Sequence, residues 1–326
     1  MGPSGSSEHQ VQRGVSNCGN NGAVTRRRSL LLLVLVAVVA ATAWLVVSPP
    51  PFLAEASPRD QPSTVVGDPV PPVVDLPTVR IAVAGDTGTG DAAQAATVER
   101  MVLESQQDPY DALLLLGDLV YPDGDAALVD RVVTEPFAPL VDGGAELLPV
   151  LGNHDIVSGE QQQILTALGR QTPWYVELVG PVRVVVLDSN QVEEPAQTEW
   201  LQDTLAEPQP SGTWTVVAMH HPAYSAGKHG SELPAREAWS PLFAAADVPL
   251  VLAGHDHDYQ RSTPQDGVTY VVSGGGAKMR PTGREDFTAV SASTLHYLDL
   301  LVYDDRLIGR AIDQSGHLVD TFTLTR

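Results

Sequence analysis

Residues 112–121 read Ala-Leu-Leu-Leu-Leu-Gly-Asp-Leu-Val-Tyr, an apolar run that stops at Gly117-Asp118. A run without polar alternation is typical of a strand that is buried on both faces. The carboxylate of Asp118 then follows the carboxyl end of that strand, which is where open α/β sheets carry their functional sites. This stretch therefore predicts an α/β fold with a polar site at one edge of a sheet.

The same pattern recurs along the chain. Similar apolar runs are Val79–Ala84, Leu147–Leu151, Val182–Leu187, Trp214–Met219 and Val248–Ala253. Helix-like stretches lie between several of them, at Ala92–Ser105 and Ala196–Leu205, while the tail from Val268 to Thr325 is typical of hairpins. Alternating strands and helices followed by hairpins predict an α/β domain with mixed sheets.

Metal-binding side chains follow five of the predicted strands. The five segments are Gly85-Asp86-Thr87-Gly88, Gly117-Asp118, Gly152-Asn153-His154-Asp155, His220-His221-Pro222 and Gly254-His255-Asp256-His257. Any one of them alone most often marks only a turn. Five in succession, each after an apolar run, predict one metal centre rather than a purely structural set.

Composition excludes other classes of site. The 326 residues include 40 Asp and Glu against 19 Lys and Arg, a net charge of −21, which argues against a nucleic-acid partner. Cys18 is the only cysteine, so an intrachain disulfide and a multi-cysteine zinc or iron–sulfur site are both excluded. Metal chemistry here rests on histidine and carboxylate ligands.

The charge divides the chain into two parts. Residues 1–47 hold four arginines and one glutamate, so the net charge is +3 here and −24 in the remainder. Residues 29–47 are predicted to form a signal-anchor or signal-peptide helix, because the 18 residues from Leu30 to Val47 carry no charge and would span about 27 Å. Arg26, Arg27 and Arg28 keep residues 1–28 as a basic cytoplasmic tail under the positive-inside rule.

Two outcomes are open for this helix. The length of the apolar run favours an uncleaved anchor, whereas Ala54-Glu55-Ala56 fits a signal peptidase site, with secretion after cleavage near Ala56. A buried core helix is a further, less favoured reading. Residues 48–78 contain nine prolines and are predicted to form an extended linker, followed by a catalytic domain over residues 79–326. We expect that domain to be extracytoplasmic, attached to the membrane through residues 29–47 if they are uncleaved.

The five motifs resemble the calcineurin-like metallophosphoesterase superfamily, and within it the purple acid phosphatases of the short, tartrate-resistant, single-domain type. Two residues favour that subgroup. Gly88 stands where general members carry a histidine ligand, and Tyr121, three residues after Asp118, stands where purple acid phosphatases supply a phenolate. The resemblance implies a four-layer α/β/β/α sandwich of two mixed sheets, the metallo-dependent phosphatase fold.

The resemblance also implies seven ligands for two metal ions. One ion would take Asp86, Asp118, Tyr121 and His257, and the other would take Asp118, Asn153, His220 and His255, with Asp118 bridging. Fe(III) with a divalent partner leaves a net charge of +1 after two carboxylates, a phenolate and a hydroxide, whereas two divalent ions leave none. A phenol ionises more readily beside a trivalent ion, so Tyr121 favours Fe(III) with Fe(II), Zn(II) or Mn(II). The alternative is two divalent ions with Tyr121 packed nearby.

Other polar residues take supporting roles in this interpretation. His154 is the candidate donor to the transition state, with Asp155 orienting it, and His229 is the candidate general acid or substrate contact. We expect His221 to pack or hydrogen-bond beside the ligands, and Tyr259 and Arg261 to brace the last motif.

Three functions are consistent with these residues. The first is hydrolysis of small phosphate monoesters, with a metal-activated hydroxide attacking phosphorus in line. The second keeps the site but hydrolyses phosphodiesters or nucleotides. The third is a non-catalytic surface binding protein, which the full set of ligands disfavours.

Overall fold

The computed structural model describes residues 67–326. The predicted tail (1–28), the predicted helix (29–47) and the first part of the predicted linker lie outside the described residues. Within residues 67–326, no helix combines the length and the apolar character that a membrane span requires.

The first sheet has six strands and mixed pairing. In spatial order they are β13 (Leu318–Thr325), β12 (Arg306–Asp313), β11 (His296–Val302), β1 (Val79–Ala84), β2 (Ala112–Leu115) and β3 (Glu146–Pro149). The neighbours β1, β2 and β3 are parallel, whereas β11, β12 and β13 extend the sheet as antiparallel strands.

The second sheet has seven strands and is also mixed. In spatial order they are β10 (Thr288–Ala292), β8 (Tyr259–Ser262), β9 (Thr269–Ser273), β7 (Leu250–Ala253), β6 (Trp214–Ala218), β5 (Val182–Val186) and β4 (Tyr175–Val179). Strands β5, β6, β7 and β9 are parallel to one another, and the edges of the sheet are antiparallel.

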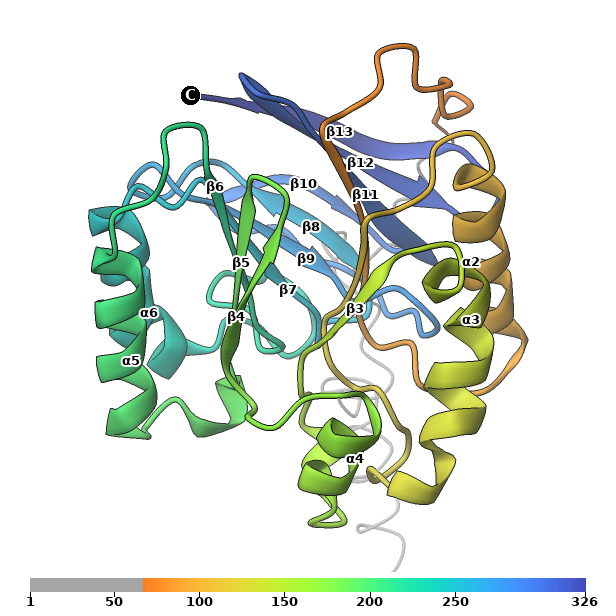
Figure 1. Cartoon of the computed structure of the whole chain (residues 1–326), viewed down its shortest axis with the longest axis horizontal. Helices are drawn as coiled ribbons and strands as arrows, with labels where there is room; N and C mark the ends of the chain where they lie inside the picture. Colours follow the sequence, from red (N-terminus) through yellow and green to blue (C-terminus); the bar gives the residue numbers. More distant parts are fainter. Residues whose placement is uncertain (1–66) are drawn as a thin grey trace, which may run out of the picture. The chain divides into compact units, whose positions relative to one another are not determined.

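Helices cover the outer face of each sheet (Figure 1). The described helices are α2 (Ala92–Glu104), α3 (Glu135–Val141), α4 (Gln161–Ala167), α5 (Pro195–Ala206) and α6 (Leu233–Ala245). Asp91 caps the N-terminus of α2, because its side chain accepts hydrogen bonds from the backbone N–H groups of Ala93 and Gln94. Helix α5 begins with Pro195, a residue that suits the first turn because no N–H is needed there.

Three apolar clusters establish the layers. The first contains Val83 of β1 and Val216 of β6 and fills the space between the two sheets. The second packs α2 and α3 against the first sheet, and the third packs α5 and α6 against the second. The order is therefore helices, sheet, sheet, helices, which confirms the predicted α/β fold with two mixed sheets.

Burial on both faces explains the continuous apolar runs. In β2, Leu114 lies in the cluster between the sheets, whereas Leu113 and Leu115 lie in the cluster under the helices. Successive side chains of a strand point to opposite faces, so a strand covered on both sides is mostly apolar, and a buried charge such as Arg80 on β1 is paired, here with Asp299.

The prediction of hairpins for the tail was only partly correct. Strands β11, β12 and β13 do form successive antiparallel pairs. Strand β9, however, lies parallel to β7, and β10 pairs with β8 instead of its neighbour in sequence. The tail thus completes both sheets, because β11 also joins β1.

The described end of the Pro-rich segment contacts the domain. The backbone N–H of Val70 donates to the carbonyl of Gly316 at 2.8 Å, and that of Leu318 donates to Asp68 at 2.9 Å. Pro69 and His317 form an isolated antiparallel bridge, and Val70 packs on the cluster beneath α2. Residues 68–70 therefore lie beside the beginning of β13.

Candidate metal centre

The loops after β1, β2 and β7 direct three candidate ligands into one site. Asp86, Asp118 and His255 all have left-handed backbone conformations, with φ of 59°, 52° and 71°. This region costs a non-glycine residue on the order of 1–3 kcal/mol, and residues in it cluster at functional sites. The backbone of Asp86 is held by a 3.0 Å hydrogen bond to the carbonyl of Gly117, so the first two loops are joined directly.

One cluster contains the four residues predicted for the first metal ion. The phenol oxygen of Tyr121 lies 2.7 Å from Oδ2 of Asp118, 3.2 Å from Oδ1 of Asp86 and 3.3 Å from Nε2 of His257. Nε2 of His257 also lies 3.3 Å from Oδ1 of Asp86. Two carboxylates, a phenol and an imidazole thus face one point.

A second cluster contains the residues predicted for the other ion. Oδ1 of Asn153 lies 3.0 Å from Nε2 of His220 and 2.9 Å from Nδ1 of His255. Oδ1 of Asp118 lies 3.4 Å from Nε2 of His220. Asp118 therefore faces the second cluster with one carboxylate oxygen and the first cluster with the other.

The hydrogen-bond chemistry of the second cluster fits a cation. Nδ1 of His220 lies 2.8 Å from the carbonyl oxygen of Leu116 and must donate there, so a neutral ring has a bare lone pair on Nε2. That lone pair faces the oxygen atoms of Asn153 and Asp118, which are acceptors as well. Acceptors that converge in this way are satisfied by a metal ion, and nitrogen and oxygen ligands of this kind suit iron, zinc and manganese.

The protonation states of the ligands also fit the binding of a metal ion. Burial, with a smaller effect of neighbouring His220, lowers the pKa of His255 to about 2, and burial with nearby Arg280 lowers the pKa of His257 to about 3. Both rings are therefore neutral and able to ligate. Burial and the Asp118 carboxylate raise the pKa of Asp86, and burial and both carboxylates raise the pKa of Tyr121. The phenol stays protonated until a strong cation is bound.

A glycine permits the close approach of two strand ends. A Cβ atom at Gly152 would lie 2.1 Å from the backbone nitrogen and 2.3 Å from Oδ1 of Asp118. No side chain fits there, so the glycine before Asn153 is required for Asp118 to sit between the two clusters.

His154 lies beside the centre as predicted. Its backbone N–H donates to Oδ1 of Asp118 at 2.9 Å, and its ring centroid lies 4.5 Å from that of Tyr121. Nδ1 of His154 faces the carbonyl oxygen of Pro122, which fixes the ring and leaves Nε2 as the atom that can reach a substrate.

The role predicted for Asp155 was wrong. Its carboxylate accepts hydrogen bonds from the backbone N–H groups of Val120 at 2.9 Å and Gly152 at 2.7 Å, and not from the ring of His154. Asp155 is fully buried, and burial raises its pKa to about 7. It therefore joins the loop after β2 to the loop after β3.

Two further histidines lie next to His255. The ring of His229 lies 4.4 Å from that of His255, and its Nε2 contacts Nη1 of Arg280. Arginine can only donate, so Nε2 of His229 accepts and a neutral ring carries its proton on Nδ1. The ring of His221 lies 4.5 Å from that of His255, and its Nδ1 is 2.8 Å from Oγ of Ser189, as expected for a supporting residue.

Tyr259 and Arg261 connect the two sheets. Both lie on β8 and bond to Asp320 of β13: the phenol donates to Oδ2 at 2.8 Å, and Nε of Arg261 donates to the same oxygen at 2.6 Å. They brace the sheet that carries the last motif, through a partner that the sequence did not indicate.

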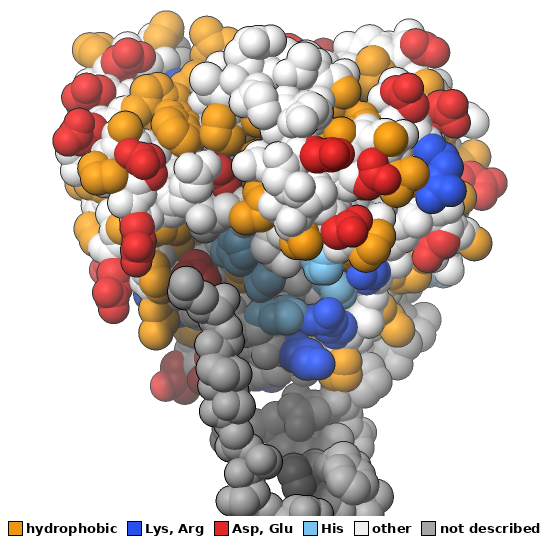
Figure 2. Space-filling view, turned by 90° about the horizontal axis from the view of Figure 1, so that it is seen from below, with side chains coloured by type: hydrophobic (Ala, Val, Ile, Leu, Met, Phe, Trp, Pro, Cys, Tyr) orange, Lys and Arg blue, Asp and Glu red, His pale blue; other side chains and the backbone are white. Residues whose placement is uncertain are grey.

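Two basic residues of the site were missed from the sequence. Nζ of Lys278 lies 3.4 Å from the centre of the Tyr121 ring, and Arg280 contacts His229. Figure 2 shows basic side chains gathered beside the histidines on this face. The signal was present as Gly274-Gly275-Gly276 followed by two cations, but it becomes informative only once β9 is known to lie parallel to β7.

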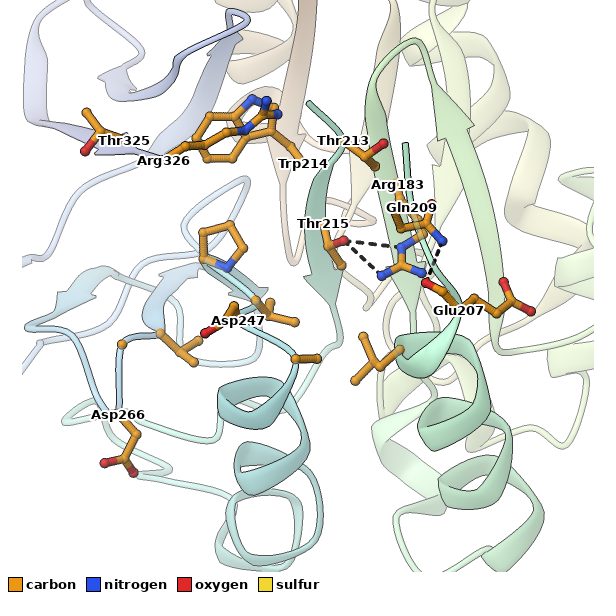
Figure 3. Close-up of a pocket in the computed structure, with 16 residues that line it drawn as sticks. Arg183, Glu207, Gln209, Thr213, Trp214, Thr215, Asp247, Asp266, Thr325 and Arg326 are labelled. Carbon is orange, nitrogen blue, oxygen red and sulfur yellow. Dashed lines mark hydrogen bonds between the residues drawn. The ribbon is translucent and has the colours of Figure 1, made fainter. Parts of the chain in front are cut away.

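A cavity of about 540 Å³ lies at the opposite ends of the parallel strands, where β6, β7 and β9 begin (Figure 3). Its wall includes Arg183, whose guanidinium donates to Oγ1 of Thr215 and to the carbonyl of Thr204. Glu207, Asp247 and Asp266 also line it. None of the predicted site residues lies in this cavity.

Comparison with known proteins agrees with the geometry. The model of the calcineurin-like phosphoesterase family matches residues 79–259. Purple acid phosphatase 21 of Arabidopsis thaliana is 31% identical over 57% of this chain and 45% of its own length. Human tartrate-resistant acid phosphatase type 5 is 27% identical over 64% of this chain and 76% of its own length. A cAMP/cGMP dual specificity phosphodiesterase of Mycobacterium tuberculosis is 32% identical over 45% of this chain and 48% of its own length.

A solved structure supports the fold. Purple acid phosphatase from yellow lupin seeds superposes with a TM-score of 0.68 and 19% identity, covering 79% of this chain and 55% of the plant protein. The chain spans about half or less of the length of the curated relatives that it matches first.

Proposed function

Because the chain belongs to the calcineurin-like phosphoesterase family, we propose that it hydrolyses small phosphate monoesters with a dinuclear metal centre of the purple acid phosphatase type. The observation that carries the proposal is the position of Asp118, whose two carboxylate oxygens face separate groups of candidate ligands. The acid phosphatases among the relatives support the choice of substrate class.

In this proposal the seven ligands divide as the two clusters do. Asp86, Tyr121 and His257 hold one ion, Asn153, His220 and His255 hold the other, and Asp118 joins them. When bound, the two ions supply Lewis acidity toward the phosphate oxygens and a water of lowered pKa for in-line attack on phosphorus.

The protein's own groups handle the charge and the protons. Nε2 of His154, on a ring fixed by Pro122, is placed to donate to an equatorial oxygen as negative charge accumulates there. The ring of His229 lies next to that of His255, and its Nδ1, the nitrogen not held by Arg280, is the candidate atom to protonate the leaving alkoxide. The ring of His221 packs against that of His255, and its own Nδ1 is held by Ser189.

The identity of the metal pair is a further part of the proposal. Burial between two carboxylates raises the pKa of Tyr121, so a phenolate there requires a strongly charged ion. We therefore favour Fe(III) with Fe(II), Zn(II) or Mn(II) over two divalent ions. Membrane attachment through residues 29–47 and an extracytoplasmic location remain predictions that concern residues outside those described.

Hydrolysis of phosphodiesters is the second candidate. The mycobacterial phosphodiesterase relative favours it, and the ligands alone do not separate the two substrate classes.

The test of the two candidates uses the purified full-length chain, loaded with iron and zinc or manganese. Its turnover is measured on p-nitrophenyl phosphate and on bis(p-nitrophenyl) phosphate, together with metal content. A clear preference for the monoester supports the first candidate. A preference for the diester supports the second candidate instead. Inactivity on both substrates contradicts the hydrolysis of phosphate esters.

A further inference from the structure

The segment after β9 is fixed against two of the metal-binding loops. The backbone N–H of Gly276 donates to the carbonyl of Gly85 at 3.1 Å, and the N–H of Arg280 donates to the carbonyl of His257 at 2.8 Å. A Cβ atom at Gly274 would lie 2.7 Å from Oδ2 of Asp86, so the chain passes directly over that ligand. Lys278 and Arg280 are therefore held at the metal centre by the backbone.

Lys278 lies on the side of the first cluster. Its Nζ is 3.4 Å from the centre of the Tyr121 ring, a position typical of a cation–π contact. The side chain is partly buried, whereas Met279 next to it is 56% exposed. The ammonium group thus lies against a ligand of the centre.

Arg280 lies on the side of the second cluster. Its Nη1 contacts Nε2 of His229, whose ring lies 4.4 Å from the ring of His255. The two cations therefore lie beside different groups of the centre, Tyr121 and His229.

Neither cation is paired with a carboxylate. Among residues 67–326, no ion pair within 4.0 Å involves Lys278 or Arg280, as is also the case for Arg236 and Arg284, whereas Arg80, Arg261 and Arg310 each bond to an aspartate. The chain beyond residue 47 carries a net charge of −24, so carboxylates that could pair with a cation are abundant in it. Cations that stay unpaired in such an acidic domain are available to an external anion.

We propose that Lys278 and Arg280 form an anion-binding pair that contacts the phosphoryl group of the substrate and makes the centre prefer dianionic monoesters to monoanionic diesters. This inference rests on the proposed hydrolysis of phosphate esters. A phosphate monoester carries a charge of about −1.5 to −2 at pH 7, and charge-assisted hydrogen bonds to it are stronger than those between neutral groups. A diester carries a single negative charge and gains less from two cations.

The test compares the wild type with Lys278→Gln, Arg280→Gln and the double variant, all as metal-loaded full-length protein. The matched control is Arg284→Gln, because Arg284 is exposed on the same segment and bonds only to the carbonyl of Ala289. The measurements are the Kd for inorganic phosphate by titration calorimetry, kcat and KM on both esters, and metal content.

We expect the Kd for phosphate and the KM for the monoester to rise at least about tenfold in each single variant, as the loss of a hydrogen bond between charged groups implies. The KM for the diester should change less than about threefold, and the control should stay within about twofold of the wild type. Metal content should not change in any variant.

Two results would contradict the proposal that Lys278 and Arg280 bind the phosphoryl group. One is a double variant with an unchanged Kd for phosphate and an unchanged monoester KM, which would mean that the cations only balance the ligand carboxylates. The other is an equal loss on both esters together with a loss of metal, which would mean a structural role. If the wild type hydrolyses neither ester, the proposed function fails, and the Kd for phosphate still decides whether the pair binds anions.

Discussion

The backbone N–H of Tyr121 donates a 3.0 Å hydrogen bond to the carbonyl of Gly88, so the two residues on which the resemblance to purple acid phosphatases is based are in direct contact. A Cβ atom at Gly88 would lie 2.0 Å from the carbonyl oxygen of Leu119. The loop that brings the phenol to the centre therefore occupies the space that a side chain at position 88 needs. No side chain, histidine included, fits at position 88 while the loop after β2 follows this path.

Replacing Tyr121 with Phe tests the phenolate. The ring and its contact with Lys278 remain, while the oxygen that faces Asp86, Asp118 and His257 is removed. We expect the iron-loaded wild type to show a visible phenolate-to-iron charge-transfer band and the variant to lack it. An active, colourless and iron-free wild type would contradict Fe(III) at this site, and an unchanged band in Tyr121→Phe would exclude Tyr121 as its source.

His154→Gln tests the donor to the transition state. We expect kcat on p-nitrophenyl phosphate to fall by about 10²-fold with metal content unchanged, because the ring contacts the centre without being one of the seven ligands. His317→Gln is the control, since His317 lies 3.7 Å from Asp313 and outside the site. A fall of less than about threefold in kcat would remove His154 from the mechanism.

His229→Gln tests the general acid through the leaving group. Phenol is a poorer leaving group than p-nitrophenol, so its departure depends more on protonation. We expect hydrolysis of phenyl phosphate to slow much more than that of p-nitrophenyl phosphate. Equal slowing of the two substrates would assign His229 to substrate binding, and would fit its contact with Arg280.

His296 predicts a pH dependence of stability that is separate from the metal centre. It is fully buried on β11, with Nδ1 3.0 Å from the carbonyl of Thr294 and Nε2 3.1 Å from Oγ of Ser273. Burial lowers its pKa from 6.5 to about 4. Between these values the unfolded state binds the proton and the folded state does not, so stability is lost as the pH falls from 6.5 toward 4.

The measurement is urea unfolding of the wild type and His296→Gln at about pH 7 and about pH 4.5. The pH-dependent loss attributable to His296 is on the order of 2–3 kcal/mol, since one unit of pKa corresponds to about 1.4 kcal/mol. On acidification, the free energy of unfolding of His296→Gln should therefore fall by that amount less than the free energy of unfolding of the wild type. Parallel losses in the two proteins would show that His296 is protonated in the folded state.

The sequence predicted which residues come together because its signals are local. Strand β1 spans Val79–Ala84 as expected, because burial on both faces leaves a run in which Arg80 is the only polar residue. The seven candidate ligands come together because each follows the carboxyl end of a strand or lies a few residues beyond it.

What the sequence did not predict depends on long-range pairing or on side-chain direction. Lys278 and Arg280 reach the site because β9 pairs in parallel with β7, and no local pattern in the sequence indicates this pairing. Asp155 follows His154 in the sequence, yet in the short helical turn His154–Ile156 the two side chains diverge. Asp320 became the partner of Tyr259 and Arg261 through contact between the two sheets.

The central claim is that Asp118 joins two metal ions that together hydrolyse a phosphate ester. The most direct measurement is the metal content per chain, determined alongside turnover of p-nitrophenyl phosphate, for the wild type and Asp118→Ala. We expect two metal ions and steady turnover in the wild type, with loss of at least one ion and of hydrolysis in the variant. Unchanged turnover in Asp118→Ala, or a fully active wild type that binds a single ion, would contradict it.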